Sequence, residues 1–132
     1  MEEEDQLITL KNQDGDKFIP FSVSKNLRQD ATSIISTVNN NGVQGIIVGN
    51  SNFESQLGTN SSLSNYNPQE KNTFTSLEHM IGPLSQADID NDGDLDIFVG
   101  GRVIPAQYPM PASSMLYTNN KGEYIPLSLI HI

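Results

Sequence analysis

The chain has 132 residues and no cysteine, which excludes disulfides and thiolate metal sites. Sixteen acidic residues against seven basic ones give a formal net charge of −9, and the basic residues are scattered, so nucleic acid is not expected as a partner. No apolar stretch approaches the roughly 20 residues of a membrane-spanning helix, so no membrane span is expected either.

Short strands separated by turns are predicted along the chain. Their predicted bounds are 7–10 and 17–21 around a turn at 12–16, then 33–38 and 43–48 around a turn at 39–42, then 73–77, 85–89, 94–99, 114–118 and 123–127, with a hairpin turn at 119–122. No segment carries a 3.6-residue apolar stripe over three helical turns. The chain is therefore predicted to be all-β.

The most informative segment is an acidic loop in which five aspartates alternate through nine residues: Asp88, Asp90, Asp92, Asp94 and Asp96. Unit charges a few Å apart repel by about 1 kcal/mol or more per pair at a surface-like dielectric, so the cluster needs a compensating positive charge. Oxygen ligands at alternate positions suit Ca2+, and Gly93 permits the tight turn. The five aspartates are therefore predicted to bind Ca2+, with Asp96 closing the site. A merely solvated acidic turn is the alternative.

Two other uses of such a loop fit these residues less well. An EF-hand closes its cage with a Glu at position 12 and continues as a helix, but position 12 counted from Asp88 is Val99, and residues 95–99 are strand-like. Glycoside hydrolysis needs two carboxylates that face each other across a substrate, whereas alternation in one tight turn directs these at one cation. With no catalytic motif elsewhere, the chain is predicted not to be an enzyme.

The acidic loop, followed by Ile97-Phe98-Val99-Gly100, resembles the calcium-binding FG-GAP/VCBS repeat, a blade unit of β-propellers that is also seen in integrin α chains. The continuation through residues 100–105, 108–109 and 114–117 is similar to the ASPIC/UnbV-like branch of bacterial propeller proteins. This resemblance covers Gln86 to Tyr124. It implies β-propeller blades, an extracytoplasmic location and binding of the metal by the five aspartates.

An internal repeat supports the prediction of blades. Residues 46–49 (Ile-Ile-Val-Gly) align without a gap with residues 97–100 when the chain is shifted by 51 positions. The upstream loop at 37–45 keeps the turn glycine, Gly42, but has none of the carboxylates. It is interpreted as a decayed site, or as a turn held by Asn side chains, and no metal is assigned to it. A period of this size is typical of stacked or radial repeats.

Four segments are predicted: an N-terminal partial blade at 1–30, a degenerate FG-GAP/VCBS-like blade at 31–81, the calcium-binding blade at 82–126 and a non-native tail at 127–132. Closed propellers usually hold 4 to 8 blades, so about two repeats are expected to be part of a larger propeller or to self-associate through open blade edges. The tail resembles translated sequencing-adapter read-through, with a genuine edge strand as the alternative. Residues 1–5 lack a signal-peptide pattern, so a lost upstream segment is expected.

Two functions from different classes are predicted. The first is a binding or adhesion module of an extracellular, periplasmic or cell-surface protein, in which structural Ca2+ supports recognition of a protein or glycan. The alternative is a non-catalytic fragment of a propeller hydrolase or lyase whose active site lies on missing blades. The Pro-rich stretch 105–111, with Arg102 and Tyr108, is expected to form a stiff recognition loop beside the calcium turn. A connector between blades is the alternative for this loop.

Overall fold

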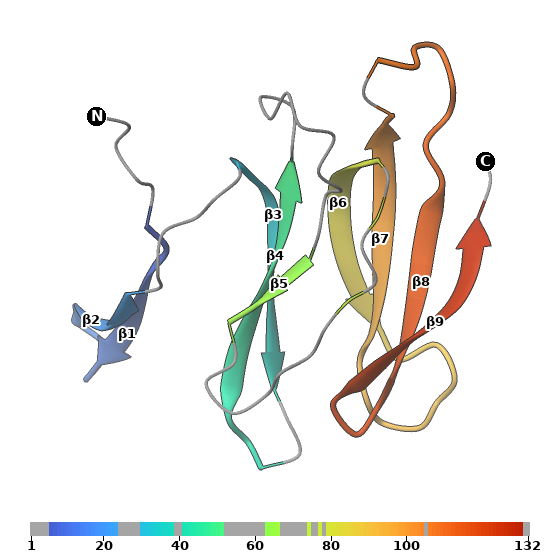
Figure 1. The fold of residues 1–132 in the computed structure, drawn as a ribbon. Helices are drawn as coiled ribbons and strands as arrows, with labels where there is room; N and C mark the ends of the chain where they lie inside the picture. The colour runs from blue at the N-terminus through green and yellow to red at the C-terminus, as the bar shows by residue number, and fades with distance from the viewer. Residues whose placement is uncertain are drawn as a thin grey trace. The chain divides into compact units, whose positions relative to one another are not determined.

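The structure is a computed structural model that describes residues 6–23, 30–38, 41–51, 63–66, 74, 77, 79–104 and 106–130. These residues form strands and turns without any helix, and the strands make three antiparallel sheets (Figure 1). The predicted all-β class is thereby confirmed. The strands are β1 (Ile8–Gln13), β2 (Lys17–Val23), β3 (Asp30–Val38), β4 (Gln44–Ser51), β5 (Leu63–Asn65), β6 (Met80–Ala87), β7 (Asp96–Val103), β8 (Ser114–Asn120) and β9 (Glu123–Ile130).

The described part of the chain contains no helix of the length and hydrophobicity that crossing a membrane requires. The chain divides into two compact units, Met1–Asp30 and Ala31–Ile132. The first unit contains β1 and β2, which pair antiparallel around a turn in which Asp14 and Gly15 have φ values of 57° and 83°. The Gly15 N–H donates to Asn12 Oδ1 over 3.1 Å, so this turn is held locally, as an Asx-type turn is.

The second unit contains two sheets in which chain order and spatial order agree: β3-β4-β5 and β6-β7-β8-β9. In the first sheet Val48 on β4 pairs with Ser64 on β5, and in the second Val99 on β7 pairs with Met115 on β8. Val99 follows Val48, and Met115 follows Ser64, by the same 51 positions that separate the two copies of the internal repeat. The two β-ladders therefore have the same register relative to that repeat.

One hydrophobic core joins the two sheets of the second unit. Its fully buried members include Ile47 from β4, Ile81 from β6, and Val99 and Tyr117 from β7 and β8. Phe74 packs its ring edge-on against Tyr117, with the ring centroids 5.5 Å apart. The apolar residues that alternate along β7 supply this core, because successive side chains of a strand point to opposite faces of the sheet.

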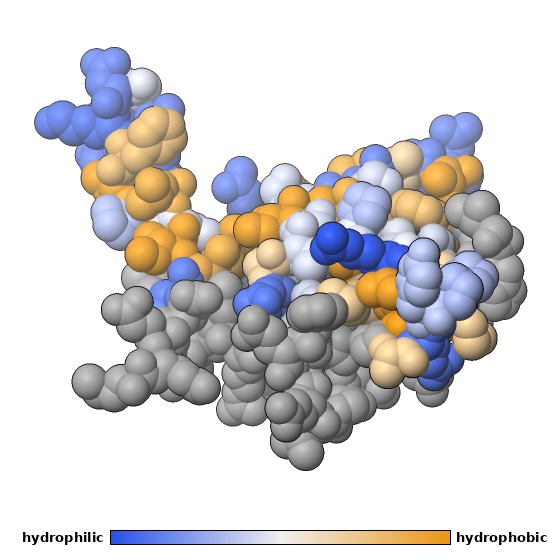
Figure 2. Space-filling model, turned by 90° about the horizontal axis from the view of Figure 1, so that it is seen from above, coloured by the Kyte–Doolittle hydropathy of each residue, from blue (hydrophilic) through white to orange (hydrophobic). Residues whose placement is uncertain are grey.

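A polar contact also links the sheets: the Leu84 N–H on β6 donates to Ser33 Oγ on β3 over 3.1 Å. Outside the core, apolar and polar residues share the described surface, and orange and blue areas lie side by side in the view from above (Figure 2). Several large apolar side chains are among the exposed ones, including Phe18 on β2 and Ile125 on β9.

Most observed strands extend beyond their predicted ends. The β6 strand begins at Met80 and not at residue 85, because its first residues are buried and pair with the end of β7. The strand predicted at 73–77 lies mainly outside the described residues, within which Phe74 is not in a strand. Part of the predicted tail, residues 127–130, belongs to β9 and pairs with β8. Residues 1–5, 131 and 132 lie outside the described part of the chain.

Candidate metal centre

The acidic loop connects β6 to β7, and strand pairing brings its two ends together. Asp88 follows directly after β6, and Asp96 is the first residue of β7. Ala87 and Asp96 are cross-strand partners, so the chain enters and leaves the loop at neighbouring points of the sheet. The β-hairpin, and not the local sequence alone, therefore places the first and last acids of the loop beside each other.

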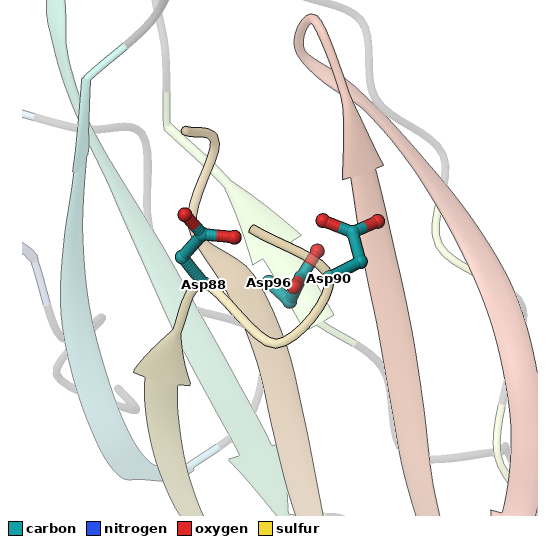
Figure 3. A group of neighbouring side chains, drawn as sticks. All are labelled: Asp88, Asp90 and Asp96. Carbon is teal, nitrogen blue, oxygen red and sulfur yellow. The ribbon is translucent and has the colours of Figure 1, made fainter. Parts of the chain in front are cut away.

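Three of the five aspartates converge. One carboxylate oxygen each from Asp88, Asp90 and Asp96 lies within 4.8 Å of the other two, and Figure 3 shows the three side chains gathered at the loop. Oxygens that bind the same Ca2+ at 2.3 to 2.6 Å lie at most about 5 Å apart. The three oxygens thus satisfy the spacing that one Ca2+ requires, and the oxygen-only donor set is the kind that this hard cation prefers.

Left-handed backbone conformations turn the peptide groups of the loop toward these carboxylates. Asn91 and Gly93 have φ values of 63° and 94°. The Asp92 N–H is 3.2 Å from both Asp88 Oδ1 and Asp90 Oδ1, and the Gly93 N–H donates to Asp88 Oδ2 over 3.1 Å. These amides partly offset the negative charge and hold the carboxylates near one another. Glycine suits position 93 because L side chains rarely adopt this conformation.

Asp96 is the rigid member of the group, since its side chain is only 1% exposed. Its Oδ2 accepts a 2.8 Å hydrogen bond from the Ile89 N–H, and its Oδ1 accepts one of 2.9 Å from the Asn119 N–H. A buried carboxylate is stabilised by such charge-assisted bonds. Each oxygen has a second lone pair, so the two bonds fix the carboxylate in place without preventing it from binding a cation.

The other two predicted ligands lie in the same loop but outside the converging group. Asp92 Oδ1 accepts a 2.9 Å hydrogen bond from the Asp94 N–H. Asp94 Oδ2 accepts a 3.0 Å hydrogen bond from the N–H of Lys121, in the turn between β8 and β9. The structure thus brings together Asp88, Asp90 and Asp96 and gives Asp92 and Asp94 contacts with the backbone.

Crowding of the loop affects the protonation of Asp90. Desolvation by the surrounding atoms, followed by repulsion from the charges of Asp92 and Asp96, raises the pKa of Asp90 above its ordinary value. The hydrogen bond from the Asp92 backbone acts in the opposite direction but does not cancel the effect. A cation at the centre of the group would remove this penalty, because an adjacent positive charge favours the ionised carboxylate.

Sequence reasoning missed the contribution of Asn119. Its side chain is buried; Nδ2 donates to the Leu95 carbonyl over 3.2 Å, and Oδ1 accepts from the Gly122 N–H over 2.8 Å. The only relevant signal in the sequence was the turn predicted at 119–122. That signal gives no indication that the turn lies against the acidic loop, which is distant from it along the chain.

The predicted recognition residues are far from the metal centre. Arg102 is exposed near the end of β7, and Tyr108, in the loop between β7 and β8, is 89% exposed. The expectation that this loop lies beside the calcium turn is wrong. The acidic loop precedes β7 and the Pro-rich loop follows it, so they lie at opposite ends of this strand (Figure 1). At about 3.3 Å per residue, an eight-residue strand separates its ends by roughly 20 Å or more.

The upstream loop of the repeat also has a glycine in the left-handed conformation, but it lacks the acids. Gly42 has a φ of 72°, which is comparable to the left-handed conformation of Gly93. Asn39 and Asn40 lie outside the described residues. Within the described part of the chain, the only cluster of three or more potential ligands from His, Cys, Asp and Glu is the one formed by Asp88, Asp90 and Asp96.

Fold and site together define an all-β protein with one converging group of carboxylates in its described part. No protein-family model matches this chain, and no significant similarity is found to curated proteins or to solved structures. Its function is therefore inferred from its own residues and their geometry.

Proposed function

We propose that the loop between β6 and β7 binds Ca2+ in a structural role, through Asp88, Asp90 and Asp96. The observation that carries this proposal is the convergence of three carboxylate oxygens within 4.8 Å, with one of the three carboxylates buried and anchored by two backbone amides. Repulsion within such a group is unfavourable unless a cation offsets it. Asp92 and Asp94 are proposed as further ligands, through their side chains or through backbone oxygens of the loop.

In this proposal Ca2+ acts by joining the end of β6 to the start of β7. Asp88 and Asp96 lie on the two sides of the hairpin, and Asp90 closes the group from the loop. Binding to the folded chain alone stabilises it, by about 2.7 kcal/mol when free Ca2+ is about 100 times the dissociation constant. The metal performs no chemistry, so the chain is proposed to be non-enzymatic.

We further propose that the two sheets of the second unit are blades of a β-propeller of the FG-GAP/VCBS type. Three observations support this: the four strands β6 to β9 form an antiparallel meander, the two sheets share one core, and both β-ladders follow the spacing of the internal repeat. A blade assignment fits an exported or cell-surface protein, because free Ca2+ in the range of weak extracellular sites is found outside the cytosol.

The proposed role of such a module is recognition of a protein or a glycan. The loop between β7 and β8 presents Tyr108 and Met110 to solvent, at 89% and 56% exposure. Two backbone hydrogen bonds order the loop, from Gln107 N–H to the Ile104 carbonyl (3.2 Å) and from Met110 N–H to the Gln107 carbonyl (2.7 Å). An exposed aromatic side chain on an ordered turn, with Arg102 nearby in sequence, is the kind of surface that binding sites use.

The experiment that tests the calcium proposal is thermal unfolding, followed by circular dichroism, in EGTA and across a Ca2+ titration from micromolar to about 10 mM. The variant Asp90→Asn is compared with Asp16→Asn, which removes one exposed carboxylate from the turn between β1 and β2. We expect Ca2+ to raise the melting temperature of the natural chain and of Asp16→Asn, and to have a smaller effect on Asp90→Asn. Equal responses in all three chains, or none in the natural chain, would contradict the proposal.

A further inference from the structure

Hydrogen bonds join the acidic loop and the start of β7 to the end of β8 and the turn that follows it, although these segments are distant along the chain. The Asn119 N–H donates to Asp96 Oδ1, and its Nδ2 donates to the Leu95 carbonyl. The Lys121 N–H donates to Asp94 Oδ2. In each of the three bonds the donor belongs to the β8–β9 hairpin, and the acceptor belongs to the acidic loop or to Asp96 at the start of β7.

Asn119 is the centre of this contact. Its side chain is 8% exposed and forms two bonds, one into the acidic loop at Leu95 and one within its own hairpin, from the Gly122 N–H. Lys121 and Gly122 have φ values of 52° and 94°, as in a tight two-residue hairpin turn. The Asn119 side chain therefore fixes the turn and the acidic loop with respect to each other.

The hydrogen bond from Asn119 to Asp96 connects this contact to the proposed metal site. Asp96 is the only buried member of the converging group, so its position depends on its donors more than on solvent. One donor, the Ile89 N–H, is inside the loop, and the other, the Asn119 N–H, comes from β8. If β8 shifts, the carboxylate loses one of its two anchors.

We propose that Asn119 is a positioning residue of the metal centre, and that metal occupancy is coupled through it to the turn at residues 121 and 122. This inference rests on the proposed calcium function. Asn119 binds no metal itself; it holds the Asp96 carboxylate where it can bind one. Because coupling between two sites is reciprocal, a metal that orders Asp96 also orders the hairpin, and loosening the hairpin weakens metal binding.

The expected size of the effect follows from other metal sites, in which groups that hold the ligands typically change metal affinity by roughly 10- to 100-fold when they are replaced. Asn119→Ala keeps the backbone N–H that donates to Asp96, but it removes the two side-chain bonds, to the Leu95 carbonyl and from the Gly122 N–H, that fix this N–H beside the carboxylate. Asn120→Ala is a matched control, because Asn120 is the next residue of β8 and is exposed. Calorimetric Ca2+ titration is expected to show affinity at least about tenfold weaker for Asn119→Ala and unchanged for Asn120→Ala.

A second measurement separates positioning from a general loss of stability. In the natural chain, the amide NMR signals of Lys121 and Gly122 are expected to shift on Ca2+ addition and to follow the same saturation curve as those of the acidic loop. The Gly122 signal tests the coupling through Asn119, because its N–H donates to Asn119 Oδ1, whereas the Lys121 N–H donates directly to Asp94 Oδ2 and reports on the acidic loop itself. The NMR measurement does not depend on whether Asn119→Ala folds.

The outcomes distinguish the two proposals. If the natural chain binds no Ca2+, both fail. If it binds Ca2+ but Asn119→Ala has the affinity of Asn120→Ala, the positioning role is overturned and the calcium site stands. If the Gly122 amide signal stays unchanged while those of the loop saturate, the coupling through Asn119 is overturned. Weaker binding by Asn119→Ala, together with shifting hairpin amides, supports both the site and the coupling.

Discussion

A Cβ atom placed on Gly49 would lie 2.8 Å from Cγ2 of Ile81, which is closer than a side-chain carbon normally comes to another heavy atom. Gly49 is in β4 and Ile81 is in β6, so the two sheets of the second unit approach each other tightly at a point where the first has no side chain. Ile81 is fully buried in the shared core. The glycine is therefore required for packing and not for its backbone conformation.

Gly49→Ala is expected to lower the free energy of unfolding by about 1–3 kcal/mol, the usual cost of overpacking a core. Urea unfolding measures this loss. Combining it with Ile81→Ala, which removes the clashing methyl group, should cost less than the sum of the two single changes, because residues in contact are energetically coupled. Simple additivity would show that the two residues do not restrict each other.

Asp96→Asn is expected to destabilise the chain even without calcium. The Asp96 carboxylate is buried and accepts a backbone hydrogen bond at each of its two oxygens. The asparagine amide has only one oxygen, so one of the two backbone N–H groups loses its acceptor. The loss should be about 1–3 kcal/mol, as for a buried donor left unpaired. Urea unfolding in EGTA measures it, with Asp90→Asn as the control that removes an exposed carboxylate from the same loop. Equal stability of the two variants would contradict the anchoring role of Asp96.

Asp90 is expected to titrate above its ordinary pKa of 3.8 in the calcium-free protein, because desolvation and neighbouring charges oppose its ionisation. The folded state then holds this proton more tightly than the unfolded state. Protonated Asp90 therefore favours the folded state at low pH, and this contribution to stability is lost as pH rises through the raised pKa. NMR titration of the Asp90 carboxyl group measures the shift.

Bound calcium is expected to reverse this effect, since a cation beside the carboxylate favours its ionised form. The Asp90 titration is therefore expected to move to lower pH in saturating Ca2+, and calcium affinity should fall as the solution is acidified through the calcium-free pKa. A midpoint that is the same with and without Ca2+ would indicate that Asp90 does not contact the metal.

Replacing Tyr108 or Arg102 by Ala is expected to change the free energy of unfolding by no more than about 0.5 kcal/mol, because both side chains are exposed. Calcium affinity should also be unchanged, since these residues lie at the end of β7 opposite the acidic loop. Urea unfolding and calcium titration test both statements. A clear loss of stability would favour the interpretation of this loop as a connector over that of a recognition surface.

The sequence by itself determined the all-β class, the order of most strands and the position of the acidic loop. These features follow from short-range patterns: alternation along strands, turn residues, and a cluster of like charges close together in the sequence. Strand ends were predicted less well, as at β6, because pairing with a distant strand decides where a strand begins.

Only the tertiary structure decided how the five aspartates divide their roles. Asp88 and Asp96 meet because β6 and β7 pair, and Asp94 contacts Lys121 because β8 and β9 return to the same end of the sheet. The extended strand β7 places Tyr108 far from the acidic loop, although the two segments are close along the chain. Local sequence describes neighbours within a few positions, whereas a β-sheet brings together residues from distant strands, and only there does Asn119 reach Asp96.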